Sequence, residues 1–171
     1  MFSIVKATDE DFELLADIGK KSFIESHGKS ALKEDIDGYV NNKYSTAYVL
    51  KELSDRNNIY HIIYHENKPA GYSKIILNAA SSSIAIKNVT KLERLYLLKE
   101  FYGLKLGLEL FQFIVTLSKT NNQTGMWLYV WKENDKAIHF YEKAGFIITG
   151  SYDFKLTETH SNPNHQMFLK Y

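Results

Sequence analysis

The chain has 171 residues, enough for one domain with a full hydrophobic core, and we expect a single domain over residues 1–171. Its 21 basic and 20 acidic residues leave a net charge of +1, so no overall field points to nucleic acid or a membrane surface as a partner. Cysteine is absent, which excludes disulfides, cysteine metal sites and an acyl intermediate carried on cysteine.

The N-terminal segment bears on where the protein works. The first residues, MFSIVKATDED, alternate like a short strand and run into an acidic helix cap, unlike a signal peptide. No apolar segment approaches the roughly 18 to 20 residues that a membrane-spanning helix needs. We therefore expect a cytoplasmic protein without a membrane partner.

The first third of the chain predicts one strand followed by three helices. Residues 2–5 form the strand, and Thr8 or Asp9 caps a helix whose apolar residues recur at helical spacing as far as Phe23. Gly28 ends that helix. A polar second helix is expected over residues 30–39 and a third helix over residues 45–53.

The middle of the chain predicts a hairpin and a central strand. Residues 59–64 and 71–77 form the hairpin around a turn at 65–69. Residues 89–98 carry apolar side chains at both alternating sets of positions, which is typical of a strand covered on both faces. Strict alternation in this strand puts Glu93 and Arg94 on opposite faces.

The last third predicts a long helix opened by residues 101–103 and ending near Thr120, then a strand at 126–131. A helix at 134–144, stopped by Gly145, precedes strands at 146–155 and 165–170, which are separated by a loop at 161–164. The order indicates an α/β (α+β) fold with a mixed sheet of about seven strands flanked by helices. The last strand, ending in MFLKY, offers a pairing edge for a homodimer.

Two strand-to-helix junctions carry the candidate chemistry. At the first, the turn around Gly103 exposes backbone N–H groups at a helix start, which suits a phosphate. The G-x-G-x-x-G fingerprint is missing, so spacing alone favours a structural turn. At the second, Asn134 opens a short helix and Tyr141 follows two turns later, where periodicity alone favours a packing role.

Four segments considered together are more specific than either junction. LERLYL, FYGLKLG, WLYVW and ENDKAIHFYEKAGF resemble the GNAT N-acetyltransferase superfamily, most of all its PaiA-type spermidine/spermine N-acetyltransferases. The resemblance extends from about Phe23 to Phe154. It implies a GNAT fold whose splayed central strands form a cleft for coenzyme A, with acetyl-CoA as co-substrate and no metal.

The resemblance also implies how acetyl-CoA is held. The backbone of Leu95 and Leu97 would pair with the pantetheine arm like an added strand, and the glycine turn would hold the pyrophosphate through its N–H groups. Asn134 would hydrogen-bond the pantetheine, and Tyr141 would lie beside the thioester sulfur. The full expected set is Leu95, Tyr96, Leu97, Tyr102, Gly103, Leu104, Lys105, Leu106, Gly107, Asn134, Ala137, Tyr141 and Lys143.

The turn departs from the family pattern at two positions. Tyr102 stands where the family has Gln or Arg, and Lys105 stands where it has its first glycine. Because backbone groups make most phosphate contacts, a lysine at helical backbone angles would still serve.

Transfer to an amine needs a base, since a primary amine with a pKa near ~10.4 is mostly protonated at neutral pH. Glu93 is the candidate base, directly or through water, and Tyr141 is the candidate acid for the departing thiolate. The alternative for Glu93 is a structural ion pair with a cation from another segment, because an unpaired buried carboxylate is costly. The expected substrate-binding residues are Phe23, Glu25, His27, Tyr39 and Glu93.

The acceptor that the resemblance implies is a small-molecule primary amine, a polyamine such as spermidine or spermine, acetylated by direct attack. Carboxylates between residues 25 and 37 are candidates for binding a polycation. Two alternatives remain open: acetylation of another amine, such as a protein N-terminus, and a regulatory protein that binds coenzyme A with little turnover.

Overall fold

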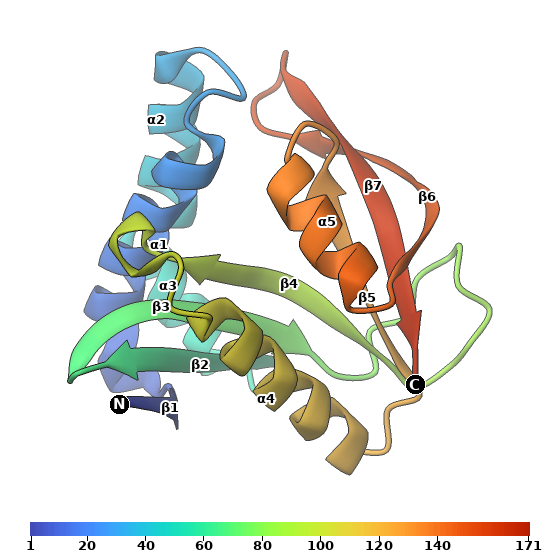
Figure 1. The fold of residues 1–171 in the computed structure, drawn as a ribbon. Helices are drawn as coiled ribbons and strands as arrows, with labels where there is room; N and C mark the ends of the chain where they lie inside the picture. Colours follow the sequence, from blue (N-terminus) through green and yellow to red (C-terminus); the bar gives the residue numbers. More distant parts are fainter. The chain divides into compact units, whose positions relative to one another are not determined.

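The computed structural model describes residues 1–171 and contains five α helices, two short 3-10 helices and seven strands (Figure 1). The strands follow the order β1-β2-β3-β4-β5-β7-β6 in one mixed sheet. The predicted α/β class with about seven strands is therefore confirmed. None of the helices combines the length and the apolar character that crossing a bilayer requires.

The chain divides into two compact units. Unit 1 holds residues 1–75 and 94–114, and unit 2 holds residues 76–93 and 115–171. Strand β4 (Val89–Leu97) and helix α4 (Leu106–Thr120) contribute residues to both units. The single domain expected from chain length stays a prediction.

Unit 1 begins with a strand and three helices, close to the predicted order. The elements are β1 (Phe2–Lys6), the 3-10 helix η1 (Asp9–Asp11), α1 (Phe12–His27), α2 (Lys33–Lys43) and α3 (Thr46–Ser54). Thr8 and Asp11 form a capping box, with the Thr8 N–H donating to Asp11 Oδ2 at 2.8 Å. Helix α2 starts and ends later than the predicted range of 30–39.

The predicted hairpin is present with a shorter turn. Strands β2 (Asn58–His65) and β3 (Lys68–Ile76) leave only Glu66 and Asn67 between them, at φ angles of 49° and 64°. Positive φ at both central positions is the backbone of a two-residue hairpin turn. The turn predicted over residues 65–69 was wrong in length, because His65 ends β2 and both Lys68 and Pro69 lie inside β3.

Unit 2 contains β5 (Gly125–Trp131), α5 (Asp135–Lys143), β6 (Ile147–Lys155) and β7 (Ser161–Lys170). The loop predicted at 161–164 was wrong, since these residues pair with β6 from Lys155 back to Tyr152. Pro163 has no N–H to donate, but its carbonyl accepts from the Lys132 N–H at 2.9 Å.

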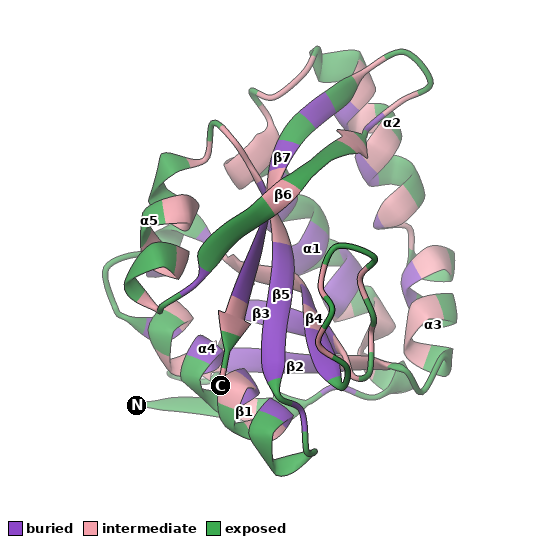
Figure 2. Ribbon diagram, turned by 90° about the vertical axis from the view of Figure 1, so that its right-hand side faces the viewer, coloured by how far each residue is buried: buried purple, intermediate pink, exposed green.

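The free edge of the sheet in unit 2 is β6 and not the C-terminal strand. β7 pairs with β5 on one side and with β6 on the other, so the MFLKY segment is not available as an edge. Figure 2 shows β6 largely exposed and β5 largely buried. The last strand therefore does not provide the free pairing edge that was predicted for a homodimer.

The alternation assumed for β4 does not continue unbroken along the strand. Thr90 hydrogen-bonds Ser118 of α4 at 2.7 Å, while the Leu97 side chain lies against Gly107 of α4. Residues seven apart fall on opposite faces of a regular strand. The prediction that Glu93 and Arg94 point to opposite faces relied on unbroken alternation, so it is no longer supported. A change of alternation within a strand is typical of a β-bulge.

His61 makes the stability of unit 1 dependent on pH. Its side chain is buried in β2, with Nδ1 unpartnered and the Phe113 ring centroid at 4.8 Å. Burial, aided by Lys6, lowers the pKa of His61 from 6.5 to about 4. Because the unfolded chain binds the proton first, the free energy of unfolding should fall as pH drops from 6.5 to 4.

We expect His61→Leu to lose this part of the acid sensitivity, worth at most about 3 kcal/mol across the window. Urea titrations at pH 7, 5.5 and 4.5 measure it. An identical pH dependence in His61→Leu and the wild type would contradict the prediction.

Candidate active site

The turn before α4 presents a row of backbone donors. The Tyr102 N–H donates to the Lys99 carbonyl at 3.0 Å, and the Leu108 N–H donates to the Lys105 carbonyl at 2.9 Å. Between them, the N–H groups of residues 103–107 donate to no protein acceptor. The helix starts at Leu106, later than the predicted opening at 101, because residues 99–101 form a separate 3-10 turn.

Lys105 does not take the right-handed helical angles expected of it. Its φ is +60°, in the left-handed region, and Gly103 lies at φ +85°. For a residue with a Cβ atom the left-handed conformation is costly, and glycine adopts it without that cost. The lysine thus takes a backbone conformation that favours glycine, and its side chain is exposed.

Three of the predicted substrate-binding residues form an aromatic group in unit 1. The Phe23 ring stacks on His27 at 4.8 Å and on Tyr39 at 4.9 Å, and His27 meets Tyr96 edge-on at 5.9 Å. Burial lowers the pKa of His27 from 6.5 to about 4, so its ring is neutral at physiological pH.

Glu25 lies apart from the aromatic contacts. Its Oε2 accepts the Lys99 N–H at 2.8 Å, so α1 is hydrogen-bonded to the 3-10 helix at residues 99–101. This short helix directly precedes the turn at residues 103–107. The carboxylate expected to bind a polycation therefore already holds a backbone donor.

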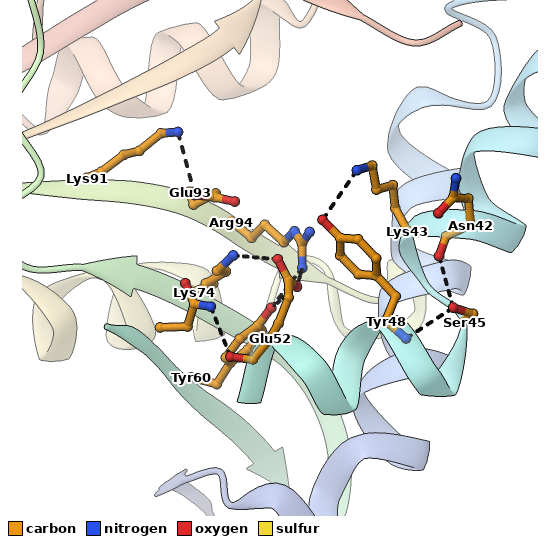
Figure 3. Close-up of polar contacts among 11 residues, drawn as sticks. Asn42, Lys43, Ser45, Tyr48, Glu52, Tyr60, Lys74, Lys91, Glu93 and Arg94 are labelled. Atoms are coloured by element: carbon orange, nitrogen blue, oxygen red, sulfur yellow. Dashed lines mark hydrogen bonds and ion pairs between the residues drawn. The ribbon is translucent and has the colours of Figure 1, made fainter. Parts of the chain in front are cut away.

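A buried ionic network in unit 1 was not predicted from the sequence (Figure 3). Glu52 of α3 accepts from Lys74 at 2.6 Å, from Arg94 at 2.9 Å and from the Tyr60 hydroxyl at 2.5 Å. Burial alone would raise the pKa of Glu52, but Arg94 and Lys74 hold it below its usual value. Its signal in the sequence was only a glutamate on the inner face of α3.

In unit 2, Glu93 lies beside an ammonium group. Lys91 Nζ is 3.5 Å from Glu93 Oε2, and both side chains are about a quarter exposed (Figure 3). The same Nζ lies over the Trp127 ring at 5.2 Å and over the Tyr129 ring at 5.6 Å. Lys91 and Glu93 are two residues apart in one strand, so the sequence could have suggested this ion pair. The two rings come from another strand, β5, and no local pattern predicts them.

Helix α5 places the other predicted residues of unit 2. The Asn134 side-chain oxygen accepts the Ala137 N–H at 3.2 Å as a helix cap, which leaves its amide NH₂ as a donor. The Tyr141 ring packs edge-on against Phe140 at 5.3 Å and Phe146 at 5.4 Å. Burial raises the pKa of the Tyr141 phenol, so it is a neutral donor. Lys143 is exposed on the last turn.

Side chains of the metal-ligating types do not gather. No group of three or more His, Cys, Asp or Glu residues lies close enough together to hold a metal ion. The residues of unit 2 offer proton transfer by a carboxylate and a phenol, and the turn in unit 1 offers backbone donors suited to an anion.

Comparison with known proteins agrees with this chemistry. The family model described as "Acetyltransferase (GNAT) family" matches residues 20–146. An uncharacterized N-acetyltransferase of Lactobacillus delbrueckii subsp. lactis is 25% identical over 153 residues, which cover 90% of this chain and 88% of the relative. One from Mycobacterium tuberculosis is 25% identical over 152 residues, covering 89% and 93%.

Solved structures share the fold. The PaiA N-acetyltransferase of Thermoplasma acidophilum, crystallised with coenzyme A, is 23% identical with a TM-score of 0.78, covering 100% of this chain and 99% of the other. The ribosomal-protein-S18-alanine N-acetyltransferase of Escherichia coli is 14% identical with a TM-score of 0.72, covering 99% and 94%. The resemblance inferred from the sequence is confirmed.

Glu52 should be required for the stability of unit 1. We expect Glu52→Ala to lower the free energy of unfolding by about 3 kcal/mol, because it removes the carboxylate that Arg94 and Lys74 share. Asp17→Ala, an exposed carboxylate on α1, is the control and should change stability by less than about 0.5 kcal/mol. Equal losses in the two variants, measured by urea unfolding, would contradict this role.

Lys105 should carry a conformational cost. We expect Lys105→Gly to unfold with a free energy about 1 kcal/mol higher than Lys105→Ala, since alanine keeps the left-handed penalty and glycine does not. Both variants lose the same charge, so the pair isolates the backbone. Equal stabilities in urea titrations would show that φ at residue 105 relaxes without cost.

Proposed function

Since the chain belongs to the acetyltransferase (GNAT) family and is an N-acetyltransferase that uses acetyl-CoA, we propose that its acceptor is a primary amine of a polyamine such as spermidine or spermine. Lys91 carries this proposal. Its primary ammonium lies 3.5 Å from the Glu93 carboxylate and over two aromatic rings. A polyamine carries the same primary ammonium group, so a carboxylate and rings of this kind suit its binding.

The turn from Gly103 to Gly107 supports binding of the acetyl donor. Five backbone N–H groups without protein acceptors, at the positive end of α4, fit an anionic pyrophosphate, and the exposed Lys105 adds a positive charge. Acetyl-CoA supplies the acetyl group as a thioester. Within unit 1, the proposal adds the backbone of Leu95 and Leu97 as groups that bind acetyl-CoA. Within unit 2, it adds the Asn134 amide and Lys143.

Glu93 and Tyr141 take the proton-transfer roles. The Glu93 carboxylate accepts a proton from the acceptor ammonium, which frees the nitrogen lone pair for attack on the acetyl carbon. The Tyr141 phenol gives its proton to the departing sulfur as the C–S bond breaks, and the proton that the acetylated nitrogen then loses restores the phenol. Glu93 releases the first proton to solvent, so the products are an N-acetylamine, a free thiol and one proton. Its raised pKa keeps that proton in place until the thiolate forms.

Two of the carboxylates predicted to bind a polycation, Glu25 of α1 and Asp37 of α2, do not strengthen the polyamine assignment. Glu25 is bonded to the Lys99 N–H, and Asp37 is paired with Lys33. The acceptor site is therefore assigned to Glu93 and the rings beside it in unit 2. The cytoplasmic location stays a prediction.

Replacing Glu93 by glutamine should expose its role as base. We expect kcat of Glu93→Gln for spermidine at pH 7 to fall by about 100-fold, because the amine must then lose its proton to solvent. Its kcat should also rise about tenfold per pH unit toward the amine pKa of ~10.4. An unchanged kcat and pH profile would exclude Glu93 as the base.

An amine panel tests the acceptor. Thiol release from acetyl-CoA is measured with spermidine, spermine, n-butylamine and a peptide with a free N-terminus. The proposal expects the highest kcat/KM with the two polyamines. Transfer to the peptide alone would favour the protein N-terminus, and calorimetric binding of acetyl-CoA without thiol release for any amine would favour the regulatory reading.

A further inference from the structure

One face of the sheet in unit 2 carries a continuous aromatic strip. Tyr129 of β5 and Tyr152 of β6 stack with ring centroids 4.1 Å apart and an interplanar angle of 13°. On β7, Asn164 lies directly opposite both Tyr152 and Trp131. Directly opposed residues of antiparallel strands share a face, so these four side chains lie on one side of the sheet.

The strip continues to Lys91 and Glu93, where we place the amine that is acetylated. Tyr129 is stacked on Tyr152, and its ring centroid lies 5.6 Å from Lys91 Nζ. Lys91 is in turn paired with Glu93. The face therefore leads from the proposed base, past an ammonium bound to aromatic rings, to Tyr152, which is 43% exposed and accessible.

Asn164 provides the independent sign of a ligand. The residue is only 7% exposed, and its Oδ1 is buried without a hydrogen-bond partner. A buried acceptor without a donor is costly in a folded protein. A group that brings its own N–H and a positive charge satisfies the oxygen and binds the π face of Tyr152 at the same time.

We propose that Tyr129, Tyr152 and Asn164 form a second ammonium subsite, which binds the cationic amine of the acceptor that is not acetylated. The inference rests on the proposed polyamine acceptor and assigns the residues that select for a second positive charge. An anion is disfavoured at the subsite, because the Asn164 oxygen and the ring faces are negative poles and the nearby Lys91 ammonium is already paired with Glu93. An uncharged alkyl chain would leave Asn164 Oδ1 unpaired.

Calorimetric titration of the full chain with spermidine tests the subsite without turnover. We expect Tyr152→Leu and Asn164→Leu each to weaken spermidine binding by about tenfold, whereas Tyr152→Phe, which keeps the ring, should bind within about twofold of the wild type. Binding of n-butylamine, which has one ammonium group, should be unchanged in all three variants.

Ser151→Ala is the matched control, since this exposed residue of β6 is adjacent to Tyr152 in the strand and bonds Lys132. Thermal unfolding confirms that each variant is folded. Wild-type protein that does not bind spermidine, or equal spermidine affinity in Tyr152→Leu, Asn164→Leu and the wild type, would overturn the subsite. Failure of the proposed function appears separately, as intact spermidine binding without thiol release.

Discussion

The burial of Glu52 against two cations and a phenol is the constraint on which unit 1 depends. The carboxylate lies on α3, while its three partners lie on β2, β3 and β4. These contacts fix the helix over the strands at one register, because a shift of either would leave charges buried without partners. The aromatic group of Phe23, His27 and Tyr39 is connected to this network through Tyr44, whose ring contacts both Phe23 and Arg94.

The sequence predicted the elements whose signals are local. Apolar spacing gave α1, the two-sided apolar pattern gave β4, and Asn134 and Gly145 marked the ends of α5 within one residue. It failed where partners far along the chain decide the structure. Ser161 to Asn164 have the composition of a loop, yet pairing with β6 makes them a strand. The turn predicted at residues 65–69 is only two residues long, because the strands extend to His65 and from Lys68.

The candidate site shows the same division between local and distant signals. The backbone donors of the turn at residues 103–107 were predicted from a local signal, a glycine just before a helix. The alternative for Glu93 expected a cation from another segment, but the cation beside it is Lys91, two residues away in the same strand. The rings of Trp127 and Tyr129 come from a strand about 35 residues later, so no local pattern announced them. Helical spacing likewise gave no sign that Glu52 would be shared by three strands.

The unpartnered oxygen of Asn164 has a consequence for how this protein tolerates change. A buried acceptor without a donor lowers the stability of the free protein, so an apolar residue of similar size at this position should make the resting fold more robust. Selection for stability alone would remove the asparagine, whereas selection for a bound cation would keep it. Stability and recognition therefore oppose each other at residue 164, and a search for heat-resistant variants should reach this position early.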